Sequence, residues 1–186
     1  LGNAMTFPMS VGATTLLLAG RPTPDVVLEI LTDERPTLFC GVPTLFSAML
    51  AALGVDDRIE SALRLCISAG EALPSAVGEG WLAKTGVDIL DGVGSTEMLH
   101  IFLSNREGDV VYGTSGVAVP GYEFRLVDEA GSEVGVGEIG ALLVAGDSAA
   151  DGYWNQRGKS RATFEGVWTR TGDKYERRED GRLVYC

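Results

Sequence analysis

The stretch LRLCISAGEALPSAVGEGWLAKTGVDILDGV, residues 63–93, decides the fold class. Two apolar runs of strand length, residues 63–70 and 87–93, enclose a segment of helix length, residues 75–85, that stops before Gly86. Continuous apolar strands are typical of a parallel sheet that is buried on both faces, and a helix between two of them forms a βαβ unit. The stretch therefore predicts an α/β fold.

The same alternation extends toward the N-terminus. The pattern predicts two further strands and two further helices: strands at residues 11–18 and 37–42, and helices at residues 24–34 and 43–53. Pro24 and Pro43 stand where a first helical turn tolerates proline. Cys40 and Cys66 lie in apolar runs, which favours buried thiols, and the spacing of the cysteines gives no metal site.

From about Asn105 the pattern changes to short strands separated by glycine-rich turns, such as YEFRLVD and EIGALLVAG. Strands at such short intervals indicate antiparallel hairpins. We therefore expect two subdomains. Residues 1–107 form an α/β part with layered βαβ units and a mostly parallel sheet, and residues 108–186 form a smaller antiparallel β part.

The composition excludes several classes of partner. A formal net charge of −11 over 186 residues argues against a nucleic-acid or anionic-membrane surface, because such partners select for basic patches. No apolar run approaches the roughly 20 residues that span a bilayer, and the N-terminus lacks the layout of a signal peptide, so we expect a cytoplasmic protein. Leu1 follows no initiator methionine and Cys186 ends a predicted strand, so we expect a piece of a longer chain.

Two glycine-containing loops follow predicted strands, SAGEALP at residues 68–74 and DGVGSTE at residues 91–97. Ligands of open α/β sheets collect at such carboxyl ends, so the two loops predict one pocket. If Met98 begins a helix, Ser95 or Thr96 is an ordinary N-cap, and the same helix start suits a phosphate. GVGST is too short for a P-loop or a dinucleotide fingerprint, which disfavours a P-loop NTPase and a Rossmann dehydrogenase.

Four motifs, taken in order, carry a family resemblance. SAGEALP, DGVGSTE, GEIGALLVAGDSAADGYW and WTRTGDKY resemble the adenylate-forming superfamily of acyl-CoA and aryl-CoA synthetases. The xGxTE motif of that family matches Gly94–Glu97, its GExxxxG...GYxN motif matches residues 137–155, and its TGD motif matches Thr171–Asp173. GSTEMLHIFLSN and RTGDKYERREDGRLVYC are most similar to the benzoate-CoA ligases.

The resemblance implies an ATP-dependent ligase of aromatic compound degradation. Such an enzyme activates benzoate or a related aromatic acid as acyl-AMP with Mg²⁺ and then transfers the acyl group to coenzyme A. The chain corresponds to the middle and later part of the large N-terminal domain. The phosphate loop upstream and the small C-terminal domain with its catalytic lysine lie outside it, so we expect the isolated segment to be inactive.

The resemblance also assigns roles to residues. It makes Thr96 and Glu97 catalytic, with Thr96 on phosphate and Glu97 as the Mg²⁺ ligand. Asp173 accepts hydrogen bonds from the ribose hydroxyls, a task that suits a carboxylate. The remaining assigned residues line two surfaces: the adenine contacts Gly70, Glu71, Ala72, Asp91, Gly92 and Val93, and the aromatic-acid contacts Gly94, His100 and Ile101.

Other interpretations stand beside these roles. On residue types alone, a lone histidine among apolar neighbours favours a packed core His100, and the TGD motif favours Asp173 as a turn residue. Many family members have an aromatic residue where this chain has Val93, which leaves an aliphatic contact there. We expect no catalytic role for the aromatic residues of GYW, residues 152–154. The alternatives for the whole are a ligase for another carboxylic acid and a non-catalytic folding or interaction module.

Overall fold

The computed structural model describes residues 2–186 and divides into two compact units, Leu1–Leu90 and Asp91–Cys186. Each unit has its own secondary structure and its own buried side chains. The subdomain boundary predicted after residue 107 follows motifs and strand spacing, not packing. It is a different feature from the division at residue 90, and the assignment of ligands to each subdomain stays a prediction.

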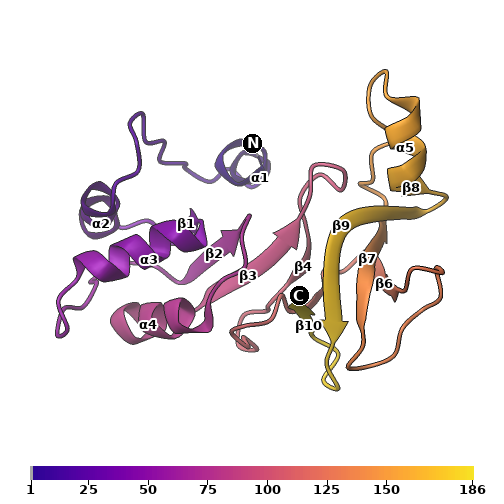
Figure 1. The fold of residues 1–186 in the computed structure, drawn as a ribbon. Helices are drawn as coiled ribbons and strands as arrows, with labels where there is room; N and C mark the ends of the chain where they lie inside the picture. The colour runs from indigo at the N-terminus through magenta and orange to yellow at the C-terminus, as the bar shows by residue number, and fades with distance from the viewer. Residues whose placement is uncertain (1) are drawn as a thin grey trace. The chain divides into compact units, whose positions relative to one another are not determined.

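The first unit alternates helices with strands (Figure 1). Its elements are η1 (Gly2–Thr6), α1 (Phe7–Ser10), α2 (Pro24–Asp33), β1 (Leu38–Gly41), α3 (Pro43–Ala52), β2 (Leu65–Ala69), α4 (Ser75–Thr85) and the start of β3 (Ile89–Gly94). Pro24 and Pro43 begin α2 and α3 as predicted, because a first helical turn does not need the N–H that proline lacks. None of the helices in residues 2–186 is long and apolar enough to span a membrane.

Parallel pairing organises the first unit. β1 and β2 run in parallel, from Leu38 opposite Leu65 to Gly41 opposite Ser68. α3 packs against both α2 and α4, which Figure 1 shows as a row of helices. Phe46 of α3 and Trp81 of α4 are fully buried and meet edge to face, with ring centroids 4.9 Å apart. These βαβ units confirm the predicted α/β class.

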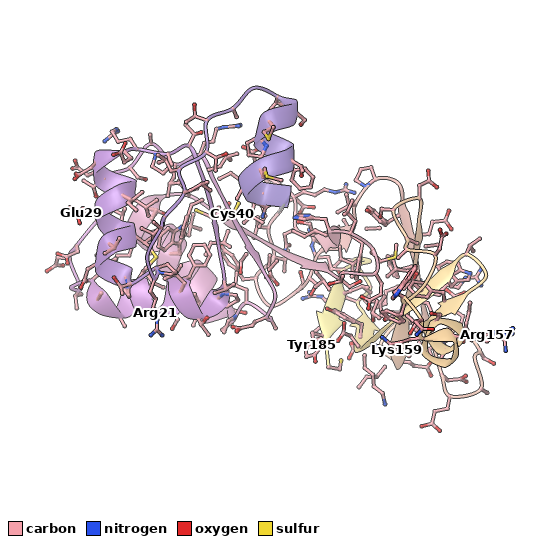
Figure 2. The ribbon with its side chains drawn as sticks, turned by 90° about the horizontal axis from the view of Figure 1, so that it is seen from above. Arg21, Glu29, Cys40, Arg157, Lys159 and Tyr185 are labelled. Atoms are coloured by element: carbon pink, nitrogen blue, oxygen red, sulfur yellow. The ribbon has the colours of Figure 1, made fainter. Side chains whose placement is uncertain are left out.

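Two details of the first unit differ from the predictions. Residues 11–18 form no strand, and Leu16, Leu17 and Leu18 are exposed. An apolar run becomes a strand only where a neighbouring strand completes its hydrogen bonds, and within residues 2–186 β1 pairs with β2 alone. Cys40, labelled in Figure 2, is exposed because side chains alternate along β1, whereas Cys66 is buried as expected.

The second unit is built mainly from antiparallel strands. Its elements are the rest of β3, β4 (Ile101–Ser104), β5 (Val117–Ala118), β6 (Tyr122–Val127), β7 (Ile139–Gly146), α5 (Arg157–Thr163), β8 (Phe164–Glu165), β9 (Trp168–Arg177) and β10 (Leu183–Tyr185). β3, β4 and β5 pair antiparallel in that order. A second antiparallel sheet has the order β10-β9-β7-β6, with β8 paired to β9. The antiparallel part of the predicted fold is confirmed.

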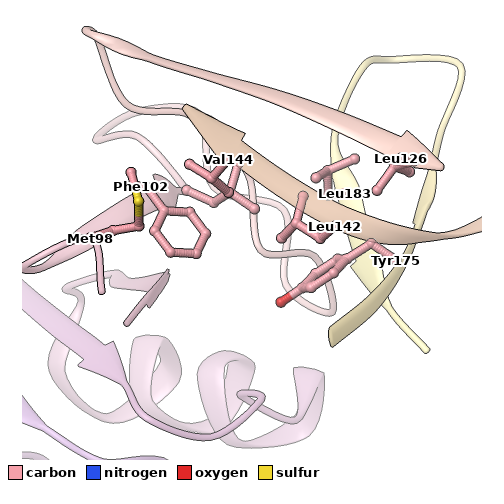
Figure 3. Packing of buried hydrophobic residues seen from close by; sticks show 8 residues of the cluster. Met98, Phe102, Leu126, Leu142, Val144, Tyr175 and Leu183 are labelled. Carbon is pink, nitrogen blue, oxygen red and sulfur yellow. The ribbon is translucent and has the colours of Figure 1, made fainter. Parts of the chain in front are cut away.

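One apolar cluster forms the core of this unit (Figure 3). Its members come from the segment around β4 and from the second sheet: Met98, Phe102, Leu103, Leu126, Leu142, Val144, Tyr175 and Leu183. Met98 is fully buried, although it lies in the connection between β3 and β4. Burial of a side chain of this size stabilises the fold by about 1.5–3 kcal/mol, so Met98 anchors the connection that holds the xGxTE motif.

Candidate active site

The connection from β3 to β4 is a pair of tight turns, so the helix start considered at Met98 does not form. The N–H of Leu99 donates to the carbonyl oxygen of Thr96 at 3.3 Å, and the N–H of His100 donates to that of Met98 at 2.9 Å. Ser95 Oγ accepts the N–H of Met98 at 3.3 Å and so caps a turn. The chain must reverse within a few residues because β4 pairs antiparallel with β3. The phosphate site predicted at Thr96 therefore has no helix dipole behind it.

Gly94 has a packing reason to be glycine. A Cβ atom at this position would lie 2.3 Å from the carbonyl oxygen of His100, a distance that no side chain tolerates. At Gly92, a Cβ atom would lie 3.0 Å from Cδ1 of Ile101. His100 and Ile101, both predicted to contact the acid, therefore lie directly against β3. The predicted role of Gly94, which is to make room for an aromatic ring, stays a prediction beside this local reason.

The His100 imidazole is half-buried, and burial lowers its pKa below the ordinary histidine value. The side chain is therefore neutral near pH 7. A neutral imidazole suits the predicted packing role, because a charged ring against apolar ligand carbon would be costly to desolvate. Ile101 is also half-buried and offers an aliphatic surface.

Glu97 is held by hydrogen bonds at both its side chain and its main chain. The hydroxyl of Tyr153 donates to Glu97 Oε1 at 2.5 Å, and the N–H of Ala150 donates to the Glu97 carbonyl oxygen at 2.8 Å. The Tyr153 hydrogen bond is the largest of several effects that lower the pKa of the Glu97 carboxyl, and the Ser95 hydroxyl and the Lys159 charge add to it. Glu97 is therefore an ionised, oriented carboxylate at neutral pH.

The TGD motif forms a β-bulge inside β9 and not the turn that residue types suggest for Asp173. Thr171–Asp173 stand opposite the single residue Leu142 of β7. Gly172 adopts a φ of 91°, in the left-handed region that glycine tolerates. Thr171 Oγ1 donates to the Leu142 carbonyl oxygen at 3.2 Å and accepts the N–H of Asp173 at 3.1 Å. Bulges re-aim side chains, and this one takes Asp173 out of the regular ladder.

Asp91 and Asp173 both act on the same phenol, that of Tyr175. Burial raises the pKa of Tyr175 to about 12, and the negative charges of Asp173 and Asp91 add to the rise. The Ser115 hydroxyl, 3.4 Å from the Tyr175 hydroxyl, opposes it. Asp91 is itself buried, and its carbonyl oxygen accepts the N–H of Asn105 at 3.0 Å. Two of the residues predicted to contact nucleotide therefore carry charges that raise the pKa of the same buried phenol.

The other predicted nucleotide loop belongs to the first unit. Gly70 follows β2 with a φ of 96°, so the loop needs glycine at this turn. Glu71 and Ala72 are exposed, which leaves their main chain accessible to a ligand. The Oγ atom of Ser68 is fully buried at the end of β2 and has no hydrogen-bond partner within residues 2–186.

Comparison with known proteins decides the family. The model of the AMP-binding enzyme family matches residues 1–154. The chain belongs to the AMP-binding enzymes. It is 56% identical over 187 aligned residues to a benzoate-CoA ligase of Thauera aromatica. A crystal structure of a benzoate-CoA ligase from Burkholderia xenovorans LB400 matches with 58% identity and a TM-score of 0.95, and an anthranilate-CoA ligase in complex with anthranoyl-AMP matches with 46% identity and a TM-score of 0.93.

The alignments cover all or nearly all of this chain but only part of each relative. They cover 100% of the chain and 36% of the Thauera protein, and 99% of the chain and 38% of the Burkholderia protein. The chain thus spans little more than a third of the length of these AMP-binding enzymes. The family assignment from the four motifs is confirmed.

A Mg²⁺ ion, which the family resemblance implies, is compatible with the side chains present. Within residues 2–186 no group of three His, Cys, Asp or Glu side chains could hold a metal ion by itself. Mg²⁺ in nucleotide-binding enzymes usually takes one or two carboxylates and completes its shell with water and substrate phosphate oxygens. Glu97, which is ionised and held in place by its neighbours, supplies one such carboxylate.

Three residues with contacts near the predicted site have no role predicted from the sequence. Tyr153 lies in the GYxN motif, for which the sequence predicts no catalytic role of the aromatic residues, and its hydroxyl contacts Glu97. Ser148 donates to the carbonyl oxygen of Met98 at 2.8 Å and contacts the Tyr122 hydroxyl at 2.7 Å, which ties the β3–β4 turn to the second sheet. The third is Tyr175, whose hydroxyl lies 3.4 Å from that of Ser115. The motif gave a signal for Tyr153 alone.

Proposed function

We propose that the chain is part of an ATP-dependent aryl-CoA ligase that converts benzoate or a related aromatic acid to acyl-AMP and then to the coenzyme A thioester. The observation that carries the proposal is 56% identity across the whole chain to two ligases whose names include benzoate, from Thauera aromatica and Rhodopseudomonas palustris. We further propose that it acts in the cytoplasm, in the degradation of aromatic compounds.

Thr96, Glu97 and Asp173 carry the ATP chemistry in this proposal. Attack of a carboxylate on the α-phosphorus forms a mixed anhydride and releases pyrophosphate, and it needs alignment and charge neutralisation more than a protein nucleophile. The Thr96 hydroxyl is exposed and suited to donate to a phosphate oxygen. Asp173, turned out of β9 by its bulge, accepts from the ribose hydroxyls. Gly70–Ala72 of the first unit and Asp91–Val93 of the second are each proposed as adenine contacts.

Glu97 would hold Mg²⁺ together with phosphate oxygens. The bound ion supplies positive charge that offsets the build-up of negative charge on the phosphates. The need for it is clear from the predicted nucleotide contacts, since Glu71, Asp91, Glu97 and Asp173 are all acidic. A polyanionic nucleotide is repelled by such groups unless cations intervene.

The aromatic acid would lie against His100, Ile101 and Gly94. His100 is neutral near pH 7 and half-buried, and Ile101 is aliphatic, which together suit an uncharged aromatic ring. The substrate carboxylate is already ionised near neutrality, so no proton transfer from His100 is required. The role proposed for His100 is to orient the ring.

The test is thioester formation by the full-length product of the gene that encodes this chain. We expect product with ATP, Mg²⁺, coenzyme A and benzoate, and a rise in melting temperature when ATP, Mg²⁺ and benzoate are added. A ligand at 100 times its Kd stabilises the folded state by about 2.7 kcal/mol. No product and no stabilisation by any combination would favour the non-catalytic module. ATP–pyrophosphate exchange by residues 1–186 alone would contradict the proposal that this segment is inactive.

Acid preference tests the pocket assignment separately. We expect Ile101→Ala to change the ratio of kcat/KM for benzoate to that for a bulkier substituted benzoate by roughly tenfold, because a methylene contact is worth about 1–3 kcal/mol in a hydrophobic pocket. Val136→Ala removes an exposed aliphatic side chain far along the sequence and serves as the control. An unchanged ratio for Ile101→Ala would assign Ile101 to the core, and a preference for cinnamate or a medium-chain acid would favour the alternative ligase.

A further inference from the structure

A phenol of the second unit contacts the carboxylate proposed to bind Mg²⁺. The Tyr153 hydroxyl donates to Glu97 Oε1 at 2.5 Å, across a sequence separation of 56 residues. A phenol that donates to a carboxylate oxygen forms a charge-assisted hydrogen bond, which is roughly twice as strong as one between neutral groups.

Tyr153 is itself fixed by the start of α5. The Tyr153 N–H donates to Ser160 Oγ at 2.9 Å, and the Ser160 hydroxyl lies 3.0 Å from the carbonyl oxygen of Gln156. The Tyr153 ring packs against Phe164, with centroids 5.5 Å apart. Lys159, labelled in Figure 2, places its Nζ 4.2 Å from the centre of the Tyr153 ring. Tyr153 is therefore held at its main-chain N–H by Ser160 and at its ring by Phe164 and Lys159.

The main chain of Glu97 is fixed from the same loop. The Ala150 N–H donates to the Glu97 carbonyl oxygen at 2.8 Å, so residues 150–153 hold Glu97 at two points. A free glutamate side chain has several rotamers to lose on binding a ligand, and that loss weakens binding. A donor that fixes one carboxylate oxygen removes much of that loss before the ligand arrives.

We infer that Tyr153 is a positioning residue of the cation site, which holds the Glu97 carboxylate in the orientation that meets Mg²⁺ on the nucleotide phosphates. The inference rests on the proposed role of Glu97. Tyr153 contacts neither phosphate nor metal in this arrangement and acts through Glu97. Partners that orient a metal ligand typically change metal affinity by about 10–100-fold when they are removed.

The experiment measures metal binding, not turnover. Mn²⁺ and a non-hydrolysable ATP analogue are titrated into the full-length protein, and free Mn²⁺ is followed by electron paramagnetic resonance. We expect Tyr153→Phe, which removes only the hydroxyl, to weaken Mn²⁺ binding about tenfold. Tyr185→Phe removes an exposed phenol from β10 and should leave the affinity unchanged.

A double-mutant cycle separates this inference from the proposed function. Glu97→Gln should weaken Mn²⁺ binding, and Tyr153→Phe should add no further loss in the Glu97→Gln background. Wild-type affinity in Tyr153→Phe, with a loss in Glu97→Gln, overturns the positioning role and leaves the proposed function intact. Wild-type affinity in Glu97→Gln overturns both. A further loss from Tyr153→Phe in the Glu97→Gln background shows that Tyr153 does not act through Glu97 and also overturns the inference.

A second variant keeps the test decisive if Tyr153→Phe does not fold. Ser160→Ala leaves the phenol in place and removes the acceptor of the Tyr153 N–H. We expect it to weaken Mn²⁺ binding by at least about twofold, in the same direction as Tyr153→Phe but by less. Unchanged Mn²⁺ affinity in a folded Ser160→Ala variant counts against the positioning role.

Discussion

The Asp173 carboxylate, which is proposed to bind the ribose hydroxyls, lowers the stability of the fold at neutral pH. Its carboxylate is half-buried in the β9 bulge, and burial raises its pKa while the Thr171 hydrogen bond opposes the rise. An acid whose pKa is raised on folding binds protons more tightly in the native state. Stability therefore falls as pH rises through the window between the ordinary and the raised pKa, and stays lower above it. We expect Asp173→Asn to be more stable than wild type at pH 7, by roughly 0.5 kcal/mol because water still screens the carboxylate.

The substitution that is expected to raise stability should also weaken ligand binding. A second substitution, with the opposite expected effect on stability, serves as the control. Asp173→Asn should weaken ATP binding, and its advantage in melting temperature should shrink as pH falls through the raised pKa. Asp180→Asn is the control, because hydrogen bonds from Arg182 lower the pKa of that exposed carboxyl, so its removal should lower stability at pH 7. A lower melting temperature for Asp173→Asn at pH 7 would contradict the assigned cause.

A motif names individual candidate site residues, and the roles given to them stay predictions. Glu97 and Asp173 lie in short motifs that can be read directly, and the structure gives both a distinctive environment. Tyr153 was not predictable as the partner of Glu97, because 56 residues separate them and only the fold brings them together. For Gly94, the sequence suggested space for a ligand, whereas the structure shows a clash with the His100 main chain that forbids any side chain.

At the scale of elements, the sequence predicted a helix correctly where residues next to it determine its bounds. Helix α4 was predicted with its observed bounds, because glycine at position 86 stops it. The strand predicted at residues 11–18 was wrong, and the helix considered at Met98 does not form, for one reason. Whether a segment pairs with a neighbouring strand depends on distant residues, and this overrides local propensity.

Two glycine substitutions in helices should change stability in opposite directions. Gly86 ends α4 with a φ of 73°, so Gly86→Ala forces a side chain into the left-handed region and should cost about 1 kcal/mol. Gly158 lies within α5 with an ordinary helical backbone and open space around it, so Gly158→Ala should stabilise by about 0.4–1 kcal/mol. Urea unfolding of the full-length protein measures both. Equal shifts of the same sign would show that backbone conformation does not control the outcome.

For the whole molecule, the change of sequence pattern near Asn105 and the division of the fold at residue 90 do not coincide. The sequence pattern changes where the predicted strands become short and are separated by glycine-rich turns. The division of the fold records where contacts concentrate, and β4 with its flanking residues packs with the later strands through Met98, Phe102 and Leu103. The pattern could not reveal this, because those residues read equally well as buried in either kind of sheet.

Because each unit has its own buried side chains, a cavity in the first unit should lower the stability of that unit. Phe46 is fully buried, and its ring contacts those of Phe39 and Trp81. Phe46→Ala removes a large side chain from this aromatic group and should cost about 3–5 kcal/mol. The fluorescence of Trp81 reports the unfolding of the first unit when the tryptophans at positions 154 and 168 are replaced by phenylalanine. The urea midpoint of this fluorescence change should fall in the Phe46→Ala variant.

The control for this prediction is Ser47→Ala, which changes an exposed residue of the same helix and should change the free energy of unfolding by less than about 0.5 kcal/mol. Circular dichroism at a wavelength dominated by β-structure follows the strands of the second unit in the same titration. If Phe46→Ala lowers the Trp81 midpoint more than the midpoint of the β-signal, the units unfold as separate cooperative blocks. Coincident shifts would show that they unfold together, and an unchanged Trp81 midpoint would contradict the core role of Phe46.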